Sequence, residues 1–195
     1  TGTQITFWPD KTIFDHVEFN FEILAHRFRE LAFLNRGILI SIRDNRSERF
    51  QEFKYEGGLA SFIGHINENK NVLHESPVYF SGKSEEVEIE VAFQYNDSYT
   101  ERIYSFVNNI NTIDGGTHLT GFKGALTRTL NSYMSSYKIA NDLKENLTGE
   151  DVREGMAAVI STRVINPQFE SQKKIKLTNV EIKGKVETLV SEYLG

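Results

Sequence analysis

Three lysines near the end of the chain are the strongest candidates for chemistry in this sequence. The segment Gln172–Lys176 holds Lys173, Lys174 and Lys176 beside a glutamine, in a polar stretch after Pro167. Such a loop can place ammonium groups on a polyphosphate and stabilise charge on a phosphoryl group during its transfer. The alternative is an ordinary solvated surface loop, and the residues alone leave both interpretations open.

Two adjacent glycines precede the longest apolar stripe of the sequence. The segment Asp114–His118 reads Asp-Gly-Gly-Thr-His, and a helix beginning there would offer free amides to an anion. The glycines lack the spacing of the familiar phosphate-binding fingerprints, so we favour a tight turn followed by a helix cap. His118 has no histidine at metal-ligand spacing and no serine or cysteine partner, which favours a structural role. We therefore predict no metal site.

Other charged positions have two interpretations each. Lys123 and Arg128 lie off the most apolar stripe of a predicted helix, where they can line a positive groove or simply keep the helix soluble. The carboxylates between Asp142 and Glu154 are spread over a predicted loop and cap. We interpret them as surface residues.

The composition is that of a soluble globular protein. Of its 195 residues, 39% are apolar and 25% charged, enough for one sizeable core or two small ones. The net charge of −5 means that any contact with DNA must come from a local basic surface. Without cysteine there is no disulfide or thiolate metal site, and no segment is typical of a membrane span or a secretion signal. We expect a cytoplasmic protein without membrane contact.

Hydrophobic spacing predicts alternating strands and helices in the first third. A strand over Ile5–Trp8, a helix over Asn20–Leu34 and a hairpin between Ile38 and Tyr55 are expected. The glycine pair Gly57-Gly58 then breaks the pattern and marks the best candidate boundary. Because the chain enters directly on a predicted strand, we interpret it as a piece of a longer protein.

Mixed elements continue after the boundary. The region Val87–Tyr95 alternates strictly, which predicts a strand with one solvated face, and Asn96-Asp97-Ser98 is expected to turn it into an antiparallel hairpin with Ile103–Val107. Further elements are a short helix at Leu59–Ile66, a long helix over Leu119–Met134, a cap at Thr148–Asp151, a buried strand at Met156–Ile160 and a final helix at Ile182–Leu194.

Seven short blocks also form an ordered pattern that covers essentially the whole chain. They are Thr1-Gly2-Thr3 with Phe7–Asp10, Arg29–Asn35, Tyr55–Gly58, Asp114–His118, Gly149–Gly155 and Pro167–Phe169. In order and spacing they resemble the B subunits of bacterial DNA gyrases, a family of ATP-dependent type II topoisomerases. The related protein of topoisomerase IV shares much of the pattern and is the alternative.

This resemblance implies an α+β fold with two layers. Residues 1–56 correspond to the C-terminal part of a GHKL-type ATP-binding domain, and residues 57–195 to a transducer domain of βαβ, ribosomal-protein-like fold. The family introduces negative supercoils into DNA, and its transducer relays the nucleotide state to the DNA gate. The catalytic base, the Mg²⁺ ligands and the glycine-rich lid of the family lie upstream of Thr1, so this chain alone is not expected to hydrolyse ATP.

The resemblance also implies partners and site residues. The partners are double-stranded DNA, the gyrase A protein and a second copy of the gyrase B protein. Thr3 matches a threonine that helps to hold the adenine of ATP. Gln172 and Lys174 match a glutamine and a catalytic lysine that reach the terminal phosphate, while Lys173 replaces the usual threonine between them. Lys123 matches an arginine that faces a cavity for DNA; the exchange keeps the charge but loses the bidentate grip on phosphate.

Three other classes of protein are weighed against this one. A chaperone or mismatch-repair ATPase would share the fold but not these blocks. A stand-alone nucleic-acid-binding module would bind duplex DNA with a steep salt dependence, which the acidic balance disfavours. A purely structural dimerisation domain would associate without nucleotide.

Overall fold

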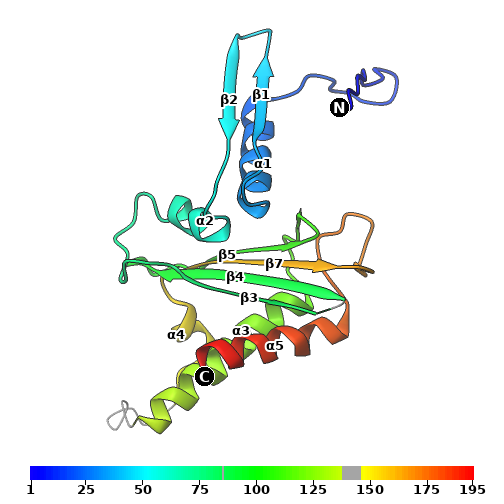
Figure 1. The fold of residues 1–195 in the computed structure, drawn as a ribbon. Helices are drawn as coiled ribbons and strands as arrows, with labels where there is room; N and C mark the ends of the chain where they lie inside the picture. The colour runs from blue at the N-terminus through cyan, green and yellow to red at the C-terminus, as the bar shows by residue number, and fades with distance from the viewer. Residues whose placement is uncertain (85, 138–145) are drawn as a thin grey trace.

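In the computed structural model, which describes residues 1–84, 86–137 and 146–195, an N-terminal layer is stacked on a five-stranded sheet with its covering helices. Figure 1 shows an N-terminal layer made of helix α1 (Phe21–Leu34) and the strands β1 (Ile40–Asp44) and β2 (Arg49–Phe53). Below it lies a five-stranded sheet, and α2 (Leu59–Ile66) covers the face of the sheet that is turned toward the N-terminal layer. Helices α3 (Thr117–Ser136) and α5 (Val180–Leu194) cover the opposite face. The mixed α/β architecture agrees with the sequence prediction.

The five-stranded sheet has the order β3-β4-β7-β5-β6. Its strands are β3 (Val78–Lys83), β4 (Val87–Tyr95), β5 (Arg102–Val107), β6 (Ile110–Asn111) and β7 (Met156–Val164). Strands β5 and β7 are parallel, and the other pairs are antiparallel. The chain returns from β5 to β7 through α3 and the short helix α4 (Gly149–Arg153), which gives the expected βαβ unit.

Local sequence signals explain the N-terminal layer. The side chain of Asn20 accepts the amide of Ile23 at 3.1 Å and caps the start of α1. Asn35 ends the helix, and Gly37 follows in the left-handed region at φ +81°. Ile40 pairs with Phe53 in the hairpin that comes next. The predicted helix and hairpin are both confirmed.

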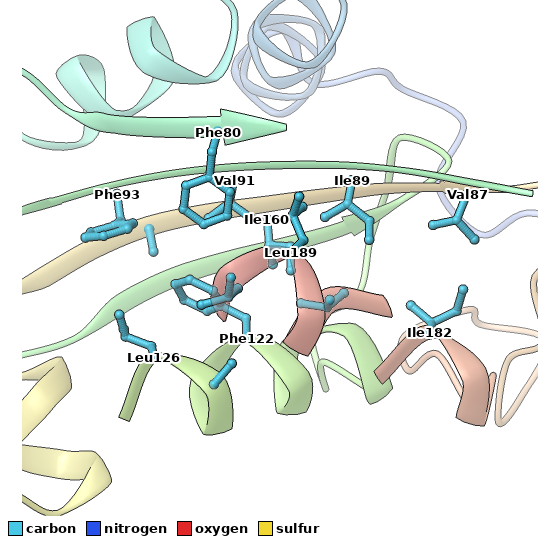
Figure 2. Packing of buried hydrophobic residues seen from close by; sticks show 14 of the residues in the cluster. Phe80, Val87, Ile89, Val91, Phe93, Phe122, Leu126, Ile160, Ile182 and Leu189 are labelled. Atoms are coloured by element: carbon cyan, nitrogen blue, oxygen red, sulfur yellow. The ribbon is translucent and has the colours of Figure 1, made fainter. Parts of the chain in front are cut away.

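The main hydrophobic core lies between the sheet and helices α3 and α5. In Figure 2, Phe80, Ile89 and Val91 descend from the sheet toward Phe122 of α3 and Leu189 of α5. A second cluster on the other face joins Ala92 and Val159 to Phe62 of α2. Strand β7 is consequently buried on both faces along most of its length, as a central strand should be.

Several predictions about strands are wrong. Residues 1–20 contain no strand, and the side chains of Ile5 and Trp8 are 81% and 82% exposed. Strands β4 and β5 do not form a hairpin, because β7 lies between them. The solvated face of β4 is only partial, since Ala92 and Gln94 are buried near α2. Strand β3 was not predicted at all.

The turn between β5 and β6 has a distinct sequence cause. Val107 pairs with Ile110 across two asparagines, Asn108 and Asn109, whose φ angles are +49° and +64°. A two-residue hairpin of this kind needs left-handed backbone at both central positions, and asparagine tolerates it better than most residues.

Two remaining points concern the chain as a whole. The start of the predicted acidic surface stretch, residues 142–145, lies outside the described residues; Glu150, Asp151 and Glu154 within that stretch are exposed. Within the part of the chain that the structure describes, none of the helices is long and apolar enough to cross a membrane.

Candidate functional site: the lysine loop and its base

The three lysines lie in the connection between β7 and α5, which we call the lysine loop (residues 166–179). The loop folds back on itself: Thr178 donates its amide to Gln168 at 2.9 Å, and Glu170 donates its amide to Lys176 at 3.1 Å. The buried side chain of Asn179 accepts the amide of Gln168 at 2.6 Å and donates to the carbonyl of Asn166 at 3.3 Å. The two ends of the loop are therefore tied together.

A second set of hydrogen bonds ties the loop to the glycine pair in front of α3. Asp114 donates its amide to the carbonyl of Ile175 at 2.9 Å. Leu177 donates to Gly115 and accepts from Thr117, both at 3.1 Å. The side chain of Leu177 is buried in the main core, so the base of the loop is held by both backbone pairing and packing.

Gly116 makes this pairing possible. A β-carbon on Gly116 would lie 2.4 Å from the carbonyl oxygen and 2.5 Å from the amide nitrogen of Leu177. The φ angle of Gly116 is +135°, which residues with a side chain rarely adopt. The glycine pair thus has a role that the sequence analysis missed: it lets one backbone approach another.

The tip of the loop is exposed. Gln172, Lys173 and Lys174 are all solvent-exposed, and Lys174 closes a turn by donating its amide to Ser171 at 3.0 Å. Lys174 has a left-handed φ of +57°. Figure 1 shows the loop rising from the sheet on the side that carries α1, not on the side of α3 and α5.

The lysines differ in their ion pairs. The ammonium group of Lys176 lies 3.1 Å from the carboxylate of Glu170 across the loop. Neither Lys173 nor Lys174 forms an ion pair with any described residue. These two cations are therefore available to an anionic ligand, while Lys176 is engaged.

An anion site at the N-terminus of α3 does not fit this structure. The amide of Thr117 is occupied by the carbonyl of Leu177, and the Leu177 backbone covers Gly116. The preferred interpretation, a turn followed by a helix, is correct. His118 is fully buried, and burial lowers its pKa to about 4. Its Nε2 lies 3.2 Å from the hydroxyl of Thr112, so the ring is neutral and structural at ordinary pH.

Lys123 of α3 belongs to a small charged cluster with Glu101, just before β5, and Arg153 of α4. Its ammonium group contacts Glu101 at 2.8 Å, and Arg153 contacts the other oxygen of the same carboxylate at 2.5 Å. Burial acts to raise the pKa of Glu101, but the hydrogen bonds from Lys123 and Arg153 outweigh it and hold that pKa below its ordinary value. Two cations flank one anion, which leaves the cluster with excess positive charge. Arg128, farther along α3, is paired with Glu187 at 3.3 Å.

Thr3 is not brought to the lysine loop. It is exposed in the coil before α1, and no hydrogen bond between described residues joins it to Gln172 or Lys174. The described residues also contain no group of three histidine, aspartate or glutamate side chains that could hold a metal ion.

Polar contacts join the two layers near the β5–β6 turn. Arg27 of α1 donates to the carbonyl of Asn109 and, at 2.8 Å, to the buried carboxylate of Glu30. On the neighbouring strand β7, Arg163 donates to the carbonyl of Leu34 at 3.2 Å. The C-terminal half of α1 is thus fixed to the sheet by two arginines.

Comparison with known proteins places this arrangement in a family. The sequence description of the DNA gyrase B family matches residues 58–195, the region from the glycine pair to the end of α5. The chain belongs to the DNA gyrase B family. The DNA gyrase B protein of Myxococcus xanthus is 55% identical to it over 100% of the chain and 24% of the relative. The corresponding protein of Clostridium acetobutylicum is 48% identical over 100% of the chain and 31% of the relative.

Solved structures agree with this assignment. The 43K ATPase domain of Thermus thermophilus gyrase B, solved with an aminocoumarin, is similar with a TM-score of 0.81 and 37% identity, over 95% of this chain and 50% of that one. A topoisomerase IV ATP-binding domain of Francisella tularensis is similar with a TM-score of 0.78 and 27% identity, over 96% and 50%. The chain spans about a quarter to a third of the length of the two curated gyrase B proteins.

Proposed function

We propose that this chain is part of the B protein of a DNA gyrase, an ATP-dependent type II topoisomerase that introduces negative supercoils into DNA. Its role is to sense the terminal phosphate of ATP and to relay the nucleotide state to the DNA gate. The observation that supports this most directly is the lysine loop: its base is fixed in the core, and its cationic tip is exposed on the side of the sheet that carries α1.

The roles proposed for the loop residues come from the family resemblance, and the exposed tip of the loop is compatible with them. Lys174 contacts the terminal phosphate of ATP, and Gln172 assists it with a neutral side chain that can donate hydrogen bonds. A cation on the terminal phosphate binds one nucleotide state better than the other, which is what shifts a conformational equilibrium. Lys173, which replaces the threonine implied by the family resemblance, adds a second cation beside the first, and neither forms an ion pair with a described residue.

The remaining proposals concern the domains, the metal ion and the partners of the complete protein. Residues 1–56 form the end of the ATP-binding domain, where Thr3 helps to hold the adenine, and residues 57–195 form the transducer. Mg²⁺ is held by residues upstream of Thr1. The complete protein dimerises on binding ATP, acts with the gyrase A protein on double-stranded DNA, and works in the cytoplasm.

Lys123 is proposed to face the cavity that receives DNA. The charged cluster of Lys123, Glu101 and Arg153 carries one excess positive charge, and a DNA phosphate can draw the two cations away from the carboxylate. Phosphate contacts of this kind depend on charge and are weakened by salt.

The test is Lys174→Ala in the complete gyrase B protein, assembled with the gyrase A protein, with DNA-stimulated ATPase and supercoiling as readouts. We expect the ATPase rate to fall by about 10²-fold or more, because a preorganised donor to the reacting group is lost. Lys176→Ala is the matched control, since Lys176 is paired with Glu170, and it should change the rate less than about threefold. Full activity of Lys174→Ala would refute the sensor role.

The same assays test Lys123. Lys123→Ala should leave the ATPase rate without DNA unchanged and reduce its stimulation by DNA, with a weaker salt dependence than the unmodified enzyme. Equal loss with and without DNA would count against a DNA contact.

The corresponding protein of topoisomerase IV is the second candidate. The structural similarity to the Francisella tularensis domain supports this alternative. The two enzymes differ in their product, so the assembled protein should supercoil a relaxed circle if it is a gyrase and only separate linked circles if it is not.

A further inference from the structure

The backbone pairing at the base of the lysine loop has a consequence for catalysis. Lys174 lies at the tip of the loop, where the one backbone hydrogen bond among the described residues is its own turn to Ser171. The hydrogen bonds that attach the loop to the rest of the fold lie elsewhere. They lie at the base, where residues 175–177 run between residues 168–170 on one side and 114–117 on the other. Any displacement of the base is therefore passed to the lysine.

We propose that Gly116 is a positioning residue for ATP hydrolysis, acting only through the lysine loop: it sets the place of Lys174 relative to the terminal phosphate. This inference rests on the proposed role of Lys174. A group that stabilises a reacting phosphoryl has to be held within a fraction of an ångström of its productive position, and an error of about 1 Å can cost about 10²-fold in rate.

The geometry around Gly116 leaves no alternative way to accommodate a side chain. The atoms that a β-carbon would meet, at 2.4, 2.5 and 2.9 Å, all belong to the backbone of Leu177. The side chain of Leu177 is only 1% exposed and packs in the main core, so its backbone can shift only at the cost of strain and of broken hydrogen bonds. The cheapest response to a methyl group at this position is the rupture of the pairing between Gly115 and Leu177, which moves the loop.

Asn179 offers a second, chemically different way to disturb the same base. It is 4% exposed, and its side chain bonds the backbone at Asn166 and Gln168, where the chain enters the loop. It contacts neither Gly116 nor Lys174 through any hydrogen bond among the described residues. If the position of the loop determines the rate of hydrolysis, substitutions at Gly116 and at Asn179 should lower that rate in the same way.

The first measurement is a double-mutant cycle in the complete gyrase B protein, assembled with its gyrase A partner and DNA, under single-turnover conditions. We expect Gly116→Ala to lower the rate of hydrolysis about tenfold or more, with less than about a threefold change in nucleotide affinity. In the Lys174→Ala background, Gly116→Ala should lower the rate by less than about twofold, since effects of residues that act through one another do not add. Asn179→Ala should behave in the same way, and it carries the test if Gly116→Ala does not fold.

The matched control is Gly184→Ala on α5. It makes the same chemical change, but a β-carbon there meets no atom within 4 Å, so rate and stability should both be kept. The melting temperature of each variant is measured as well, because a lowered value would show that the loss of rate comes from unfolding.

A second readout does not depend on turnover. A non-hydrolysable ATP analogue should protect the unmodified loop from trypsin at Lys173 and Lys174, and this protection should be lost in Gly116→Ala while the analogue still binds. Hydrogen exchange at the amide of Leu177 should be faster in the same variant, because its bond to Gly115 is broken.

The outcomes separate the two proposals. If Lys174→Ala leaves hydrolysis unchanged, the proposed function fails. If Lys174→Ala lowers the rate but folded Gly116→Ala does not, or lowers it equally in both backgrounds, the positioning role of Gly116 is wrong and the sensor role stands.

Discussion

Among the described residues, the buried side chain of His118 gives the clearest reason to expect that the stability of the fold depends on pH. It is fully buried, and burial alone lowers its pKa from 6.5 to about 4. Between these two values the unfolded chain binds a proton that the folded protein does not bind. The free energy of unfolding should therefore fall as the pH is lowered through this window and stop falling, as far as this group is concerned, below about pH 4.

We predict that His118 costs the fold about 2 kcal/mol of stability on going from pH 7 to pH 5, given about 1.4 kcal/mol for each unit of pKa difference. Denaturant unfolding at the two pH values measures it. His118→Gln should be less stable at pH 7 but should lose less on acidification. His16→Gln is the matched control, because it makes the same chemical change at an exposed site in the coil before α1.

At the residue scale, the sequence identified the exposed lysine segment but not the contacts that support it. Three neighbouring lysines are visible in one segment, and the distinction between them is not: the partner of Lys176 is found only when the loop is folded. The role of Gly116 was equally invisible, because the atoms it accommodates belong to Leu177, far away in sequence. A glycine pair indicates a tight turn, but it does not say which backbone comes close.

At the scale of elements, a buried amide network fixes the end of α2 to the end of β4. Asn67 donates to Gln94 at 2.9 Å and accepts from Asn96 at 3.0 Å. Gln94 in turn donates to the carbonyl of His74 at 2.7 Å. All three amide side chains are at most 5% exposed, so each depends on the others for its hydrogen bonds.

Asn67→Ala should lower the free energy of unfolding by about 2 to 3 kcal/mol, because it leaves the amide groups of Gln94 and Asn96 buried with fewer partners. Denaturant titration gives the value, and an unchanged m-value would show that the folded state is intact. Asn71→Ala removes an exposed amide bond to Asp97 and should cost less than about 0.5 kcal/mol. Equal losses in the two variants would contradict the network's importance.

The elements that the sequence predicted correctly are those with local causes. Helices α1 and α3 have apolar stripes within their own residues, Asn20 caps the start of α1, and the β1–β2 hairpin joins neighbouring segments. The expected pairing of β4 with β5 failed because β7, which comes much later in the chain, takes the place between them. The backbone of the supposed turn serves other segments: Asn96 donates its amide to Gly155 and Asp97 donates to Asn71.

The N-terminal segment illustrates a different limit. The alternation of Ile5 and Phe7 predicted a strand, but a strand exists only where another strand pairs with it. Among the described residues no such partner lies beside residues 1–20, and the large apolar side chains of Ile5, Phe7 and Trp8 are exposed. Periodicity reports which face of a segment is apolar; it does not supply the partner.

At the scale of the whole molecule, the question is what holds the N-terminal layer on the five-stranded sheet. Arg27 reaches from α1 to the Asn109 carbonyl in the β5–β6 turn and also neutralises Glu30, whose side chain is 7% exposed. From the same turn the chain continues through β6 to the glycine pair that supports the lysine loop. One short segment therefore touches α1 at one end and the base of the loop at the other.

Arg27→Ala should weaken the attachment of the N-terminal layer to the sheet, because it removes the bond to the Asn109 carbonyl. It also leaves the buried Glu30 carboxylate with His26 as its one remaining ion-pair partner among the described residues. We expect cleavage by a protease of broad specificity at Gly57-Gly58 to become about 5- to 30-fold faster, the range that corresponds to one or two kcal/mol. Arg29→Ala is the matched control on the same helix: Arg29 lies over the ring of Phe53, 5.3 Å from its centre, inside the N-terminal layer. If both variants were cleaved at the same rate as the unmodified protein, the Arg27 contact would not be what joins the layers. The bond from Arg163 to Leu34 and the apolar packing of Phe33 against Phe62 would then hold them.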